Sequence, residues 1–90
     1  MLIALIARDK PGALQTRLDN RDAHLAYLKE TGVVAQAGPL LDGDEQMAGS
    51  LIVLDVEDMA AAEAWVAGDP YGKAGLFSSV ELIQWKRVIG

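Results

Sequence analysis

The stretch Leu2-Ile3-Ala4-Leu5-Ile6-Ala7 decides the fold of this chain. It is apolar at every position, and the charged residues Arg8-Asp9-Lys10 and then Pro11-Gly12 follow it. A short apolar run that ends in a charged loop with proline and glycine predicts a buried β-strand. In an antiparallel sheet with one face in water, polar and apolar residues would alternate along the strand. The unbroken run therefore predicts a strand that is covered on both faces.

The rest of the chain predicts two helices and three more strands. Leucines recur at helical spacing from Leu14 to Leu28, and Gly32 is a natural C-terminal cap for that helix. Turn residues at 42–46 separate two strand-like segments and predict a hairpin, while Asp58 can cap the second helix. We expect helices over residues 13–31 and 58–67 and strands over residues 2–7, 33–41, 50–56 and 79–88. Residues 68–75 are expected to form a loop or a single helical turn.

The order strand, helix, strand, strand, helix, strand predicts an α+β fold of the ferredoxin-like βαββαβ type. Such a fold has a four-stranded antiparallel sheet with two helices on one face. The 90 residues leave no room for a second domain, so residues 1–90 are expected to form one. No further helix is available for the other face of the sheet, although residues 51–54 are also apolar throughout. We therefore expect a homodimer in which two such sheet faces pack together.

The composition excludes several classes of function. Eight Lys and Arg against thirteen Asp and Glu give a net charge of −5, which disfavours binding to nucleic acid and to anionic membranes. Single-stranded RNA binding on a sheet would also need exposed aromatic residues, and the first strand has none. The chain has no cysteine, and its opening apolar run is too short for a signal peptide or a membrane span. We expect a cytoplasmic protein.

His24 is the only histidine and thus the natural candidate for acid–base chemistry near neutral pH. At about 100° per residue, Arg21 lies inside the leucine stripe of the first helix and His24 borders it, so both are expected to face the sheet. Burial of ionisable side chains is costly unless they have polar partners. Two interpretations remain open. In the first, Arg21 forms a salt bridge with a carboxylate and His24 bonds a carbonyl, and both contacts only hold the helix on the sheet. In the second, the two side chains line a polar pocket for a small ligand.

Two further motifs are informative about local structure. Gly38-Pro39 lies in an apolar strand, where proline marks an edge, a bulge or a bend and glycine permits close approach of backbone or ligand. Asp69-Pro70-Tyr71 is typical of a turn. A metal site is not expected, because His24 and Asp69 with a carboxylate from Asp42 or Asp44 have no recognised ligand spacing.

Taken together, these motifs resemble those of the YciI-like (YCII-related) family over essentially the whole chain. The matching features are, in order, Arg21-x-x-His24, Tyr27-Leu28, Gly32, Gly38-Pro39-Leu40, Gly49, Asp69-Pro70-Tyr71 and Trp85. The resemblance implies a dimeric α+β barrel, related in fold to muconolactone isomerase and to cofactor-free monooxygenases.

The resemblance also implies a catalytic pair, which carries over to His24 and Asp69. A carboxylate bonded to one imidazole nitrogen would fix the tautomer and leave the other nitrogen to move a proton. Acid–base chemistry of the lyase, isomerase or dehydrochlorinase type on a small polar or aromatic metabolite would follow, without a cofactor. The alternative is a dimeric module that binds a small metabolite without converting it.

Four other residues are expected to contact the substrate. Arg21 could hold an anionic or enolate oxygen as a forked donor. Tyr71 could supply a phenol or an aromatic wall. Gly38 could let a ligand approach the backbone closely. Ser50 is a weaker candidate, because a hydroxyl at the start of a strand has a structural explanation.

Overall fold

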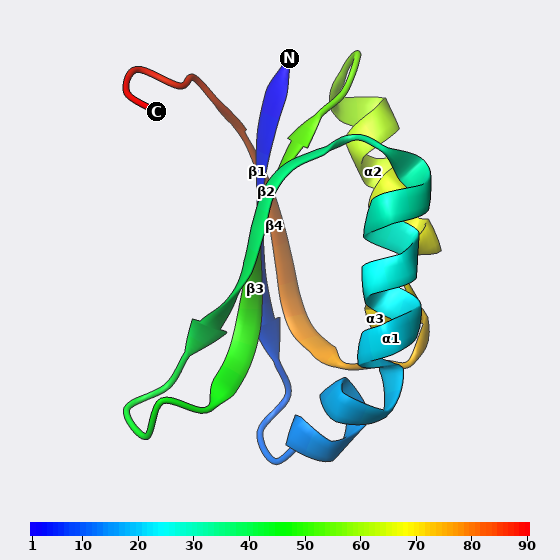
Figure 1. Cartoon of the computed structure of the whole chain (residues 1–90), viewed down its shortest axis with the longest axis vertical. Coiled ribbons are helices and arrows are strands. Elements are labelled where there is room, and N and C mark those ends of the chain that lie inside the picture. Colours follow the sequence, from blue (N-terminus) through cyan, green and yellow to red (C-terminus); the bar gives the residue numbers. More distant parts are fainter.

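The fold is a four-stranded antiparallel sheet with all helices on one face (Figure 1). The computed structural model describes all 90 residues. Its elements are β1 (Leu2–Asp9), α1 (Leu14–Thr31), β2 (Val34–Leu41), β3 (Met47–Asp55), α2 (Met59–Gly68), α3 (Pro70–Lys73) and β4 (Phe77–Trp85). The strands lie in the order β2-β3-β1-β4, and every neighbouring pair is antiparallel. The predicted ferredoxin-like α+β fold is confirmed.

Two strand boundaries differ from the prediction, because hydrogen bonding to the neighbouring strand determines where β3 begins and where β4 ends. β3 begins at Met47 instead of residue 50, because Met47 and Gly49 still pair with the end of β2. β4 ends at Trp85 instead of residue 88, because Trp85 pairs with Leu2 at the start of β1 and no strand continues beyond it. The predicted caps are present: Gly32 is left-handed with φ 66°, and the Asp58 carboxylate accepts a hydrogen bond from the Ala61 amide.

The first helix packs on the sheet with a different face from the one predicted. Leu18 and Leu25 lie on the surface, whereas Arg17 and His24 are buried. The expectation that the leucine stripe faces the core was therefore wrong for these two leucines. Arg21, expected to face the sheet, is exposed. The buried face is rotated because Arg17 and His24 both find hydrogen-bond partners beneath the helix.

The apolar core lies between the sheet and α2. It consists of Ile3, Leu5, Ala7, Ile52, Leu54, Ala62 and Trp65. Tyr27 of α1 packs against this core and links the two helices, since its hydroxyl donates a 2.7 Å hydrogen bond to the Trp65 carbonyl of α2. None of the helices combines the length and apolar character needed to cross a membrane.

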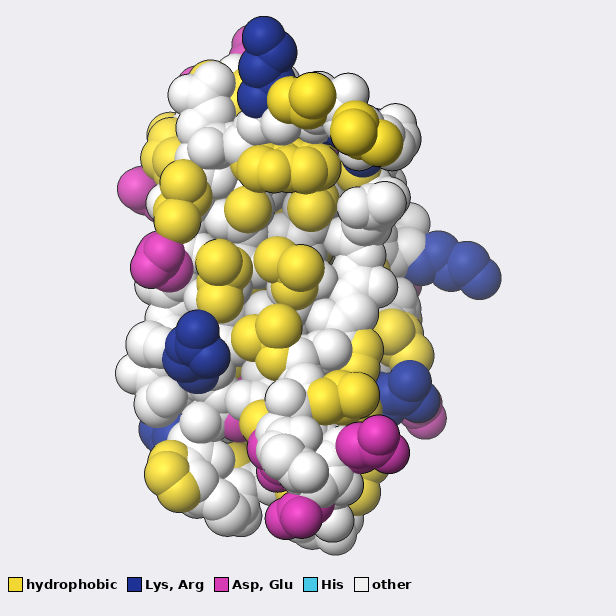
Figure 2. All heavy atoms as spheres, turned by 90° about the vertical axis from the view of Figure 1, so that its left-hand side faces the viewer, with side chains coloured by type: hydrophobic (Ala, Val, Ile, Leu, Met, Phe, Trp, Pro, Cys, Tyr) yellow, Lys and Arg dark blue, Asp and Glu magenta, His cyan; other side chains and the backbone are white.

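The opposite face of the sheet carries an apolar patch that no helix covers. Figure 2 shows this face, with hydrophobic side chains gathered along its middle. We define the outer-face patch as Leu2, Ile6, Leu51, Ile83 and Trp85. Its members are in register across the sheet, where Ile6 pairs with Leu51 and Leu2 pairs with Trp85. Alternate residues of the apolar run in β1 thus point into the core, and the residues between them point to the opposite face, where Leu2 and Ile6 belong to this patch.

Gly49 is expected to be indispensable for the close approach of β3 and β1. A Cβ atom there would collide with the backbone carbonyl of Ala7, so Gly49→Ala should lower the free energy of unfolding by about 1–3 kcal/mol. Gly38→Ala is the matched control, because its added Cβ would meet nothing within 4 Å. That variant should stay within about 0.5 kcal/mol of the wild type. Urea denaturation measures both, and equal effects would contradict the packing described.

Candidate active site

Four polar side chains are buried where α1 crosses the sheet. Arg17, His24, Ser50 and Asp69 expose 3%, 5%, 3% and 1% of their surface. Buried polar groups are stable only when hydrogen-bonded, and no buried side-chain nitrogen or oxygen in this structure lacks a partner. These residues form two bonded groups, one around Asp69 and one around Arg17.

Asp69, the single residue between α2 and α3, contacts the first helix. Its Oδ1 atom accepts a 3.1 Å hydrogen bond from the Tyr71 amide, which caps the short helix α3, and Pro70 occupies the first helical position. The same oxygen lies 2.7 Å from His24 Nδ1. Since an ionised carboxylate can only accept, Nδ1 is the nitrogen that donates to it, and in a neutral imidazole Nε2 then has a free lone pair. The structure thus brings together the two residues that the family resemblance had paired.

Tyr71 fixes the plane of the histidine ring. The two rings stack with centroids 3.8 Å apart and an angle of 13° between their planes. Burial raises the pKa of the Tyr71 phenol, and the nearby guanidinium groups of Arg17 and Arg21 only partly offset this. The phenol is therefore neutral at physiological pH. With Asp69 at its edge and Tyr71 on its face, the imidazole is held in one orientation.

Arg17 is the centre of the second group. Its Nε and Nη2 atoms donate hydrogen bonds of 2.7 and 3.0 Å to the Asp9 carboxylate, and Nη2 also donates a 2.8 Å bond to Ser50 Oγ. Burial lowers the pKa of Arg17, but the hydrogen bond and charge of Asp9 outweigh it, so the net shift is upward. The Arg17 guanidinium also lies over the Tyr71 ring, with Cζ 4.6 Å from its centroid.

Neither Arg17 nor Asp9 had been predicted as a site residue. The available signal was the spacing of Arg17 and His24, seven residues apart and therefore two turns along one helix face. The repeated leucines pointed to a different buried face, so this spacing was not used in the prediction. Asp9, at the end of β1, gives no local indication that it pairs with a helix.

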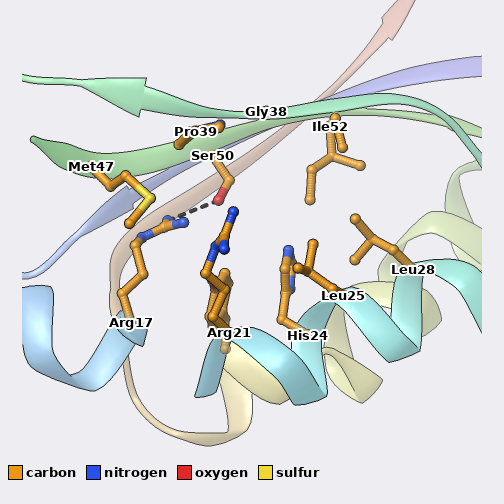
Figure 3. Close-up of a pocket in the computed structure, with 12 residues that line it drawn as sticks. Arg17, Arg21, His24, Leu25, Leu28, Gly38, Pro39, Met47, Ser50 and Ile52 are labelled. Atoms are coloured by element: carbon orange, nitrogen blue, oxygen red, sulfur yellow. Dashed lines mark hydrogen bonds between the residues drawn. The ribbon is translucent and has the colours of Figure 1, made fainter. Parts of the chain in front are cut away.

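A cavity of about 150 Å³ opens between α1 and strands β2 and β3. In Figure 3, Arg21 and His24 extend from α1 into this space, and Ser50 faces them from β3. The predicted residues Arg21, His24, Ser50, Tyr71 and Gly38 all line the cavity, together with Arg17, Leu25, Leu28, Ala37, Pro39, Met47 and Ile52. Asp69 lies behind His24 and does not line it. Their roles in binding or catalysis stay predictions.

In the acidic turn between β2 and β3, a carboxylate accepts hydrogen bonds from the backbone of the turn itself. Asp42 Oδ1 accepts hydrogen bonds from the amides of Asp44 and Gln46. No group of three or more His, Cys, Asp or Glu side chains comes together in a way that could hold a metal ion.

Replacement of Asp69 should cost more stability than replacement of an ordinary helix cap. Asp69→Ala removes a cap and also leaves the buried His24 without its partner, so we expect a loss of about 2–4 kcal/mol. Asp58→Ala is the matched control, since Asp58 caps α2 from an exposed position and should cost about 0.5–2 kcal/mol. The denaturation midpoints compare the two. Equal losses would mean that the His24 contact contributes nothing to the fold.

Comparison with known proteins places these features in a family. The model of the YCII-related domain matches residues 1–86. Protein YciI of Escherichia coli is 36% identical, with 98% of this chain and 99% of the relative covered. An uncharacterized protein of Haemophilus influenzae is 32% identical over the same shares of the two chains.

Solved structures agree with this fold. The 5-chloro-2-hydroxyhydroquinone dehydrochlorinase of Burkholderia phenoliruptrix, solved in complex with 2,5-dihydroxybenzoquinone, superposes with a TM-score of 0.89 at 37% identity. The match covers 96% of this chain and 94% of the enzyme. A putative antibiotic biosynthesis monooxygenase of Bacteroides thetaiotaomicron has a TM-score of 0.61 at 14% identity, covering 99% and 90%, and shares the fold alone. The chain is therefore a member of the YCII-related domain family.

Proposed function

We propose that this chain is an acid–base enzyme in which His24 moves a proton on a small polar or aromatic metabolite. The observation that carries the proposal is the contact between Asp69 and Nδ1 of His24, a residue that itself lines a cavity. It leaves Nε2 as the free nitrogen of a ring that two neighbours hold in place. A positioned imidazole of this kind contributes roughly 10²–10⁴-fold to a proton-transfer reaction.

Each residue of the pair would have a distinct role. His24 Nε2 would take a proton from the substrate and return it to the product or to a leaving group. Asp69 would keep the hydrogen on Nδ1 and stabilise the imidazolium that forms, as the carboxylate does in other acid–base triads. Proton transfer of this kind requires no cofactor.

The similarity to the dehydrochlorinase supports a reaction of the lyase type. That enzyme acts on a chlorinated ring with hydroxyl groups, and its complex contains a dihydroxyquinone. At 37% identity over nearly the whole chain, a ring-shaped, oxygen-bearing substrate is a reasonable class for this protein too. We place the activity in the cytoplasm, in keeping with a chain that has no cysteine.

His24→Asn tests the proposal. Asparagine can keep a hydrogen bond to Asp69 but cannot take up a proton, so turnover should fall roughly 10²–10⁴-fold while ligand affinity changes far less. Turnover is measured first on 5-chloro-2-hydroxyhydroquinone and then on a library of small ring metabolites. Lys29→Gln, an exposed change in the last turn of α1, is the control and should keep full activity.

Three outcomes would contradict this function. Undiminished turnover in His24→Asn would dismiss the imidazole as the acid–base group. Thermal-shift binding of a metabolite without any turnover by the wild type would favour a binding module. A loss of folding stability as the sole effect of the substitution would assign His24 a structural role.

We further propose that two copies of the chain pack through their outer-face patches. Exposed contiguous apolar patches are typical of protein interfaces, and this one spans β1, β3 and β4. A closed pair of sheets related by two-fold symmetry would cover both copies at once.

Leu51→Arg should abolish the dimer, because it would bury an unpaired guanidinium in the interface beside Ile6. Leu18→Arg is the matched control: Leu18 is 47% exposed against 44% for Leu51, but it lies on α1 and outside the patch. Light scattering at micromolar concentration measures the mass of each variant. A monomeric wild type, or equal effects of the two substitutions, would refute this assembly.

A further inference from the structure

Tyr27 contacts the end of α2 from the same side of α1 that carries His24. The two residues are three positions apart, so they are neighbours on one face of the helix. The Tyr27 ring lies against Trp65, with centroids 5.0 Å apart, and its hydroxyl donates a 2.7 Å hydrogen bond to the Trp65 carbonyl. His24 reaches Asp69, which follows the same helix end. Two contacts from one face of α1 therefore hold the junction between α2 and α3.

The Trp65 carbonyl is the acceptor that a longer α2 would use to continue its hydrogen bonding. In a continuous α-helix, the Asp69 amide would donate to this carbonyl, four residues before it. The Asp69 amide donates instead to the Val66 carbonyl, at 3.2 Å, and its backbone is extended, with φ −66° and ψ 123°. Pro70 favours an extended backbone in the residue before it. Tyr27 thus binds the acceptor that the Asp69 amide does not use.

Gly68 allows Tyr27 to come this close to the helix end. A Cβ atom on Gly68 would lie 2.5 Å from the Tyr27 hydroxyl oxygen and 3.1 Å from the ring carbon that carries it. A larger residue at this position would therefore push the tyrosine and the helix end apart. Gly68 directly precedes Asp69, so such a displacement would also move the carboxylate that contacts His24.

The Tyr27 phenol is protonated, and therefore a donor, at physiological pH. Burial raises its pKa, and the negative charge of Asp69 raises it further. An ionised phenolate could not donate to the Trp65 carbonyl and would repel the Asp69 carboxylate. The contact with the helix end is therefore present throughout the pH range in which a histidine ordinarily changes its charge.

We propose that Tyr27 is a positioning residue of the His24–Asp69 pair and acts through the end of α2. This inference rests on the proposed acid–base function. Tyr27 fixes the helix end, so that Asp69, the next residue along the chain, presents Oδ1 to His24 Nδ1 at 2.7 Å. A looser contact would let the imidazole turn or exchange its tautomer. Nε2 would then be available as the base for a smaller fraction of the time.

The probe for this role is the Nδ1 hydrogen of His24, since the chain has one histidine and its ring signals in an NMR spectrum are unambiguous. The rate at which this hydrogen exchanges with water measures how often the contact with Asp69 opens. Tyr27→Phe keeps the ring and removes the hydroxyl, so exchange should become roughly 2- to 10-fold faster, the factor that corresponds to one net hydrogen bond. Gly68→Ala should accelerate exchange at least as much, because the tyrosine has to move.

Thr31→Val is the matched control for the hydrogen bond. Thr31 Oγ1 accepts a 2.9 Å bond from Trp65 Nε1, which joins the same two helices one turn further along α1. This variant should lose about as much stability in urea as Tyr27→Phe, yet its Nδ1 hydrogen should exchange at the wild-type rate. Gly72→Ala is the control for the added methyl group, since its Cβ would meet only the Val66 carbonyl, at an ordinary 3.5 Å.

Turnover is the second readout, on any substrate that the wild type converts. Tyr27→Phe should lower kcat by the same factor and leave KM nearly unchanged, because Tyr27 does not line the cavity. The exchange measurement needs no substrate, so it tests the positioning role even if the protein proves not to be an enzyme. Unchanged exchange in Tyr27→Phe, or an equal acceleration in Thr31→Val, would overturn this role. If Tyr27→Phe does not fold, Gly68→Ala decides by the same comparison with Gly72→Ala.

Discussion

The hydrogen bond between His24 Nδ1 and the buried Asp69 carboxylate is the contact on which the rest of the site depends. At 2.7 Å it ties the middle of α1 to the start of α3, elements far apart in the sequence. A buried carboxylate is stable only with partners, and Asp69 has two on one oxygen. The contact therefore holds α1 against the start of α3 and keeps the imidazole stacked on Tyr71, at the edge of the cavity.

The two buried polar groups differ in the chemistry they allow. Arg17 and Asp9 form an ion pair whose cation cannot lose its proton at any physiological pH, so this pair can only orient and stabilise. The imidazole of His24 can change its charge, and its partner can support either state. A side chain that can exchange a proton and one that only carries positive charge thus lie two turns apart on one helix.

The scaffold does not require this polar site. A monooxygenase-like protein shares the fold at 14% identity, which shows that strand order and helix placement can be kept with almost entirely different side chains. In this chain the apolar core lies under α2, where Trp65 and Ala62 pack on the sheet. The space under α1 is left for Arg17, His24 and Ser50. Function therefore has to be argued from these residues rather than from the fold.

The sequence alone determined the order of elements, an unusual backbone position in the second strand at Gly38-Pro39, and Arg21, His24, Ser50, Asp69 and Tyr71 as candidate site residues. These follow from local patterns: apolar runs, turn residues and motif spacing. Only the tertiary structure decided which face of α1 is buried. Arg17 and His24 lie on the buried face, whereas Leu18 and Leu25 are exposed. The reason is physical. A helix settles on the face whose polar groups find partners on the sheet, and those partners, Asp9 on β1 and Ser50 on β3, lie 8 and 33 residues from Arg17 in the chain.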